Sequence, residues 1–66
     1  MTITTADKLK ELRREMGQRK RVYARLIENG KLTQEAANRQ IAILESIILD
    51  YEAKEKAEQP QGSLGI

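Results

Sequence analysis

The side chains best suited to chemistry in this chain are three arginines and a glutamine at helical spacing. Arg14, Gln18, Arg21 and Arg25 follow one another at intervals of four, three and four residues, so in a helix they share one face. Residues 13–25 hold six Lys or Arg and one Glu. Guanidinium groups pair well with phosphate oxygens. Such a pattern is typical of a solvated charged face, and a surface for duplex DNA or an acidic protein partner is the alternative.

Two residue types that are common in catalytic and metal sites are missing. The chain has no Cys and no His, which excludes thiolate and imidazole nucleophiles, bases and metal ligands. Neither Ser46 nor Ser63 has an evident basic partner, and no Gly-rich phosphate loop is present. Glu45, Glu52 and Glu55 have a spacing that favours helix surface ion pairs over a metal cage. We expect no enzyme activity, no cofactor, no metal and no small-molecule substrate.

The length of the chain indicates one small domain, and the net charges of its two halves have opposite signs. A core drawn from 66 residues rarely supplies more than about 3–5 kcal/mol on its own, so good helix packing or oligomerisation must add to it. Residues 1–33 carry nine Lys/Arg and four Asp/Glu, a net +5, whereas residues 34–66 carry three and six, a net −3. A basic helix lying beside an acidic one would explain this, and so would an electrostatic partner.

No membrane or export segment is evident. The longest apolar-rich run, residues 41–49, is interrupted by Glu45 and is far shorter than a bilayer-spanning helix. The first residues lack the basic start and apolar stretch of a signal peptide. We therefore expect a protein of the cytoplasm that does not enter membranes.

Two amphipathic patterns separated by a short joint must position the basic face. After a lead-in at residues 1–4, Thr4 with Asp7 predicts a capping box that starts a helix over about residues 5–28. Gly30 is suited to the left-handed conformation that ends this helix. Thr33 predicts the N-cap of a second helix.

The second helix is expected over about residues 34–58, after a turn at residues 29–33. Pro60 cannot continue it, and residues 59–66 are predicted to form a disordered tail. So short a turn makes the helices antiparallel neighbours. The fold class is therefore all-α, an antiparallel two-helix hairpin.

Apolar spacing on both helices predicts the core of this hairpin. Counted outward from the turn, partner positions should sum to about 62, which places Tyr23 near Gln40 and Ile41. The expected core positions are Leu9, Leu12, Met16, Tyr23, Leu26, Ile41, Leu44, Ile48 and Tyr51.

The second helix has more apolar surface than one partner helix can cover. Ile43 and Ile47, joined by Ala36, form an apolar edge that would be wet in a lone hairpin. A symmetric dimer that forms a four-helix bundle would cover it, and so would a different protein. We expect the dimer.

Two polar side chains fall within the apolar arcs. Arg19 and Gln40 lie in or beside the seam, so Arg19 should pair with Gln40, Glu45 or a carboxylate of a second chain, or extend its guanidinium into water. Gly17 interrupts the first helix at a cost of about 1 kcal/mol against Ala. We interpret Gly17 as simply tolerated at this position. The alternative is that it permits a close approach to the helix or a slight bend of the helix.

The stretch from Arg21-Val22-Tyr23 through the Gly30-Lys31-Leu32-Thr33 turn to Asp50-Tyr51 resembles a group of small uncharacterised proteins encoded in bacteriophages and prophages. Those proteins also show Arg-x-Tyr, a Gly-x-Leu/Met-Ser/Thr turn and an Asp-Tyr ending. The likeness covers about residues 12–52. It implies a phage or prophage origin, an accessory role and residence in the host-cell cytoplasm, and it implies no active residues.

Together these features predict a non-enzymatic helical module that dimerises and binds a host or phage protein. A duplex-DNA-binding accessory protein that uses the basic face is the second hypothesis. A purely structural oligomerisation unit is the third.

Overall fold

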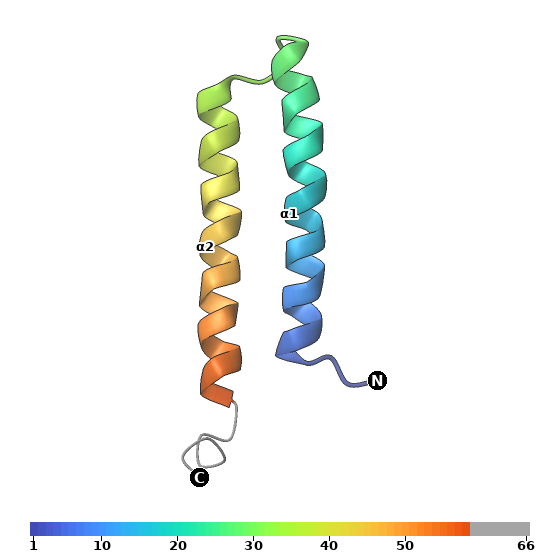
Figure 1. Cartoon of the computed structure of the whole chain (residues 1–66), viewed down its shortest axis with the longest axis vertical. Helices are drawn as coiled ribbons and strands as arrows, with labels where there is room; N and C mark the ends of the chain where they lie inside the picture. Colours follow the sequence, from blue (N-terminus) through green and yellow to red (C-terminus); the bar gives the residue numbers. More distant parts are fainter. Residues whose placement is uncertain (59–66) are drawn as a thin grey trace.

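The computed structural model describes residues 1–58, which form two long antiparallel α-helices (Figure 1). Helix α1 spans Thr5–Glu28 and helix α2 spans Gln34–Glu58. The start of α1 and the end of α2 lie at the same end of the hairpin, and the turn lies at the other (Figure 1). The predicted all-α hairpin is confirmed. The predicted tail lies outside the described residues.

The capping box at the start of α1 is confirmed. The Thr4 hydroxyl accepts a hydrogen bond from the backbone N–H of Asp7 at 3.1 Å. In return the Asp7 carboxylate accepts one from the Thr4 backbone N–H at 3.0 Å. Two backbone donors that would otherwise lack a helical partner are thereby satisfied, and the Asp7 charge lies at the positive end of the helix dipole.

The turn combines two terminating devices, both predicted from its residue types. Gly30 has φ +72°, and its N–H donates to the carbonyl of Ile27 at 3.0 Å while the next N–H, of Lys31, donates to Leu26 at 2.8 Å. This pair of bonds is a Schellman motif, which uses the last free carbonyls of α1. Thr33 then caps α2, because its hydroxyl accepts from the Ala36 N–H at 3.0 Å.

The core lies in the half of the hairpin away from the turn. Leu9, Leu44 and Ile48 are buried and touch one another, with three partly buried side chains packed around them, Leu12, Met16 and Tyr51. Leu9 has no exposed surface.

The other three expected core residues, Tyr23, Leu26 and Ile41, lie closer to the turn and are only half-buried. The buried hydrophobic residue of α2 in this half is the small Ala37, which leaves the surrounding side chains partly uncovered.

Side-chain contacts join the helices at three heights. Thr5 donates to Glu58 at 2.8 Å at the open end, and Tyr23 donates to Gln40 at 2.7 Å towards the turn. Between them Arg13 and Glu52 form an ion pair at 2.7 Å. These pairs sum to 63, 63 and 65, close to the predicted register, and the expected proximity of Tyr23 and Gln40 is confirmed.

The hairpin is one layer of helices, with principal extents of 54 × 26 × 14 Å. Both broad faces of the seam are therefore open. Within residues 1–58, neither helix is long and apolar enough to cross a membrane.

Candidate functional site

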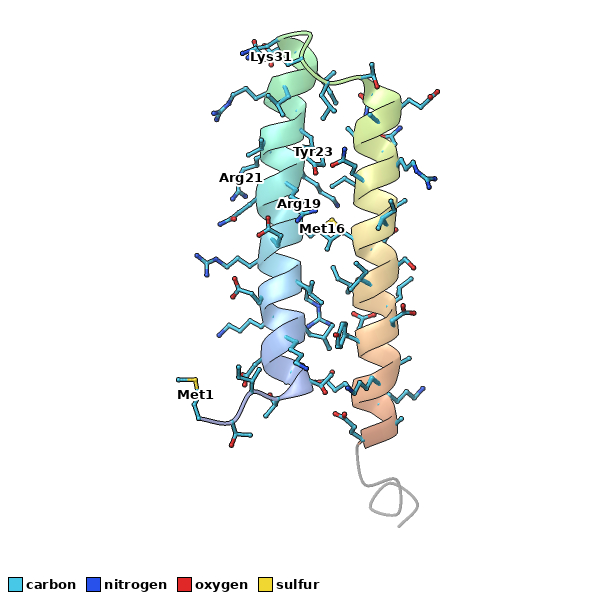
Figure 2. The ribbon with its side chains drawn as sticks, turned by 180° about the vertical axis from the view of Figure 1, so that it is seen from behind. Met1, Met16, Arg19, Arg21, Tyr23 and Lys31 are labelled. Carbon is cyan, nitrogen blue, oxygen red and sulfur yellow. The ribbon has the colours of Figure 1, made fainter. Side chains whose placement is uncertain are left out.

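The predicted basic face lies on the outer side of α1. Arg14, Gln18, Arg21 and Arg25 are all exposed. Figure 2 shows Arg21 directed away from α2. Arg14 lies 3.7 Å from Glu11, a loose pair between exposed groups, whereas the side chains of Arg21 and Arg25 form no ion pair within residues 1–58. The positive charges of Arg21 and Arg25 are therefore available to an anion.

The two helices neutralise each other less than their opposite net charges suggested. Among the described residues a single ion pair, Arg13–Glu52, crosses between them. The other two pairs, Glu11–Arg14 and Glu15–Arg19, lie within α1. The reason is geometric, because on each helix most charged side chains project away from the seam. A long side chain therefore reaches a partner on the other helix only at the edge of the seam.

We call the side of the hairpin seen in Figure 2 the rear face and the opposite side the front face. Arg19 lies between the helices on the rear face (Figure 2), and its Nε donates to the Glu15 carboxylate at 3.1 Å. Neither candidate partner across the hairpin, Gln40 or Glu45, bonds to Arg19, and its side chain is 42% exposed, as expected of a guanidinium that extends towards water. A carboxylate four residues earlier on the same helix is within reach without bridging the seam, and Gln40 is already bonded to Tyr23.

This local pair stabilises the charge of Arg19 beside the seam. The hydrogen bond to Glu15 is the main cause that raises the pKa of the Arg19 guanidinium above its ordinary value, and contacts with Tyr23 add to it. Glu15, Arg19 and Tyr23 are spaced four residues apart, so they form a polar ladder along the rear edge of α1.

Exposed apolar side chains flank this ladder. On α2, Ile43 is 49% exposed and Ile47 is 38% exposed, as predicted for a lone hairpin, while Ala36 is half-buried. On α1, Val22 is 48% exposed and follows Glu15 by seven residues, which places it on the same side. The three exposed residues Val22, Ile43 and Ile47 are called the isoleucine face below.

A shallow groove continues the rear face towards the open end. It encloses about 370 Å³ between Glu11, Leu12 and Glu15 of α1 and the Tyr51 ring of α2. Ile47 precedes Tyr51 by four residues, so the groove and the isoleucine face lie on one side of α2. The ammonium groups of Lys8 and Lys54 lie 5.8 and 5.9 Å from the centre of the Tyr51 ring, and both are cation–π contacts.

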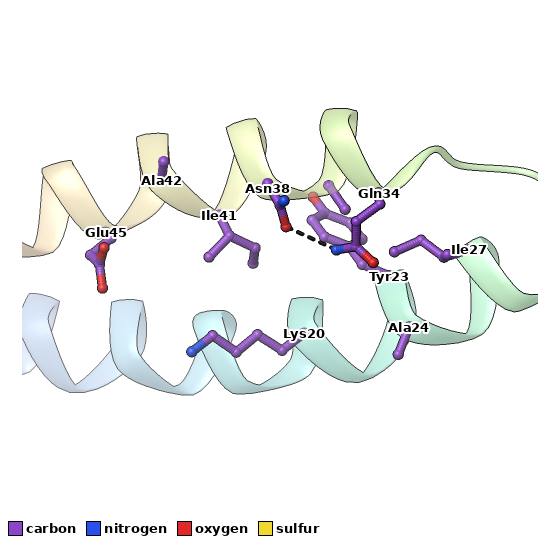
Figure 3. Close-up of a pocket in the computed structure, with 10 residues that line it drawn as sticks. Lys20, Tyr23, Ala24, Ile27, Gln34, Asn38, Ile41, Ala42 and Glu45 are labelled. Atoms are coloured by element: carbon purple, nitrogen blue, oxygen red, sulfur yellow. Dashed lines mark hydrogen bonds between the residues drawn. The ribbon is translucent and has the colours of Figure 1, made fainter.

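The front face carries a larger groove that sequence reasoning missed. It encloses about 560 Å³ near the turn (Figure 3). Its polar rim includes Lys20, Glu45 and a hydrogen bond of 2.9 Å from Gln34 to Asn38. The rest of its lining consists of three alanines and three larger side chains, Ala24, Ala37, Ala42, Tyr23, Ile27 and Ile41. The small alanines on both helices near the turn were the available signal.

No group of three or more His, Cys, Asp or Glu that could hold a metal ion occurs in the part of the chain that the structure describes. Every buried side-chain nitrogen or oxygen in residues 1–58 already has a hydrogen-bond partner. The arrangement thus offers surfaces for binding: a basic outer side of α1, an apolar rear face and a front groove.

Comparison with protein-family models, with curated proteins and with solved structures finds no match to this chain.

Proposed function

We propose that this hairpin is a non-enzymatic oligomerisation and binding module, an accessory protein of the phage type that acts through protein–protein contact. Its rear face packs on the rear face of a second copy, and the two hairpins form a four-helix bundle.

The exposure of Ile43 and Ile47 beside the seam is the observation that carries this proposal. Domains are stabilised by at least two packed layers, and this chain forms one layer that is 14 Å thick. Four hydrophobic residues are buried among those described, Leu9, Ala37, Leu44 and Ile48. A second layer on the rear face would remove the isoleucines from water at about 25 cal/mol per Å² of apolar surface.

The symmetry of the contact also favours a second copy. A twofold interface brings the same patch of both subunits together, so an apolar patch is complementary to itself. The basic outer side of α1 stays at the periphery of such a bundle, where like charges of the two chains are kept apart.

The test is the molar mass of the full chain in solution, measured by sedimentation equilibrium over a range of concentrations. We expect a dimer for the wild-type chain and a monomer for the double variant Ile43→Asp/Ile47→Asp, because two carboxylates cannot be buried unpaired. Leu49→Asp is the matched control. Leu49 is 58% exposed and does not belong to the isoleucine face, so its variant should remain dimeric.

A monomeric wild-type chain would overturn self-association and leave the rear face for a different protein. A double variant with unchanged mass and helicity would show that the subunits meet elsewhere.

A further inference from the structure

Gly17 is surrounded by cations. It is the single glycine inside α1, and on a helix surface the nearest neighbours of a residue lie three and four positions before and after it. For Gly17 these four neighbours are Arg13, Arg14, Lys20 and Arg21. We call them the Gly17 ring. No acidic side chain falls at any of the four positions.

Packing does not explain this glycine. A Cβ added at Gly17 would meet Nη1 of Arg21 at 3.9 Å, an ordinary van der Waals distance, and no other neighbour within 4 Å. Helix α2 therefore makes no close approach there that an alanine would prevent. Because glycine weakens a helix interior relative to alanine, its presence lowers stability without a steric gain inside the hairpin.

The ring cations lie around Gly17, which has no side chain and is half-buried. The Arg21 guanidinium folds back towards Gly17, as its 3.9 Å distance shows. Lys20 extends along α1 towards the N-terminal end of that helix (Figure 3). Arg13 is engaged by Glu52 at 2.7 Å and Arg14 loosely by Glu11 at 3.7 Å, whereas neither Lys20 nor Arg21 has an acidic partner within residues 1–58.

We propose that the Gly17 ring is a phosphate-binding site for the backbone of duplex DNA. With no side chain at Gly17, a phosphate oxygen reaches the helix surface, where Arg21, Lys20 and Arg14 approach it together. Several donors around one anion give stronger and more specific contacts than separate surface cations.

The length of the basic face of α1 fits a polyanion better than a single phosphate. Arg14 to Arg25 spans about 16 Å at 1.5 Å per residue, which covers several phosphates of a strand that rises ~3.4 Å per nucleotide. A duplex is favoured over a single strand because no free ring offers a stacking platform. Tyr23 is bonded to Gln40, and Tyr51 lies under two lysines. This inference is independent of the proposed dimer.

The test is fluorescence anisotropy of the full chain with a labelled DNA duplex of about 20 base pairs, at several salt concentrations from about 50 to 150 mM. We expect Arg21→Ala to weaken binding about threefold or more and to lower the log–log salt slope by about 0.9, the contribution of one phosphate contact. Gly17→Leu should also weaken binding about threefold while helicity rises, because leucine fills the space between the ring cations and favours helix.

Arg39→Ala is the matched control for Arg21→Ala. Arg39 is exposed on α2 and has no ion pair among the described residues, so its removal should leave both affinity and slope unchanged. Circular dichroism and thermal melting of each variant separate binding losses from unfolding.

Three results would overturn the proposal. They are wild-type affinity in both Gly17→Leu and Arg21→Ala, an equal loss in Arg39→Ala, and binding to heparin as tight as to DNA with no effect of the ring variants. The last two would describe diffuse attraction between charges instead of a site.

Discussion

The Tyr23 hydroxyl of α1 donates a hydrogen bond of 2.7 Å to the side-chain oxygen of Gln40 in α2. It joins the helices where the hydrophobic core has thinned, since Tyr23 is half-buried and Gln40 is exposed. The polar contact therefore holds the turn half of the hairpin, and packing of large apolar side chains holds the open half.

Removing this bond should lower stability measurably. We expect Tyr23→Phe to reduce the free energy of unfolding by about 0.5–1.5 kcal/mol, the usual net contribution of such a bond. Urea titration followed by circular dichroism measures it. Tyr51→Phe is the control, because Tyr51 contributes its ring face to Lys8 and Lys54 and a phenylalanine ring keeps that role. Equal losses in both variants would contradict a specific role for the bond to Gln40.

Replacing a leucine by alanine should be costly in the core and nearly neutral on the surface. Leu9 is fully buried, so Leu9→Ala should cost about 2–5 kcal/mol, comparable to all that a core of this size supplies. We expect the variant to lose most of its helical circular-dichroism signal at 25 °C. Leu49→Ala, at a residue that is 58% exposed, should change stability by less than about 0.5 kcal/mol. A folded Leu9→Ala with an unchanged melting temperature would contradict the assigned core.

Two glycine-to-alanine changes should have opposite signs. Gly30 has φ +72°, which disfavours any residue with a Cβ, so Gly30→Ala should lower stability by about 1–2 kcal/mol. Gly17 is helical and has room for a Cβ, so Gly17→Ala should raise stability by about 0.8–1 kcal/mol. Thermal melts of the two variants beside the wild-type chain measure both changes. A destabilised Gly17→Ala would reveal a packing constraint at that position.

Acid should weaken the N-terminal cap of α1. The backbone N–H of Thr4, and then its side chain, hold the pKa of the Asp7 carboxyl below its ordinary value. A pKa that is lower in the folded state means that the contribution is complete above the unfolded pKa of about 4, and is lost as the pH falls through the lower folded pKa. The stability difference between wild type and Asp7→Asn should therefore be present at pH 7 and shrink below about pH 4.

Chemical denaturation at several pH values measures this difference. Asp50→Asn is the control, since Asp50 is exposed and forms no hydrogen bond or ion pair within the described part of the chain. A difference for Asp7→Asn that stays constant down to pH 2 would show that the charge of Asp7 does not stabilise the cap.

Local structure was predictable because its causes are local. Thr4 with Asp7, Gly30 and Thr33 act on backbone groups no more than a few residues away, and all of them hold the roles expected from their types. The period of the apolar residues likewise placed Ile43 and Ile47 outside the seam. Both helices, the turn and the exposed isoleucines therefore followed from the order of residues alone.

Partners of long polar side chains were not predictable in the same way. Arg19 could reach several acceptors, and the choice of Glu15 depends on how far apart the helix axes lie and on Gln40 being taken by Tyr23. The opposite charges of the two halves were consistent with ion pairs between the helices, yet Arg13–Glu52 is the single ion pair that crosses the seam within residues 1–58.

The sequence by itself determined where the helices begin and end and which residues face the seam, because capping and amphipathic spacing act within one element. Only the tertiary structure decided what lies around that seam. It formed the front groove near the turn, paired Arg19 with Glu15, and showed that Gly17 has space for a Cβ. Those outcomes depend on the distance and rotation of one helix relative to the other, which are set by the packing of Leu9, Leu44 and Ile48.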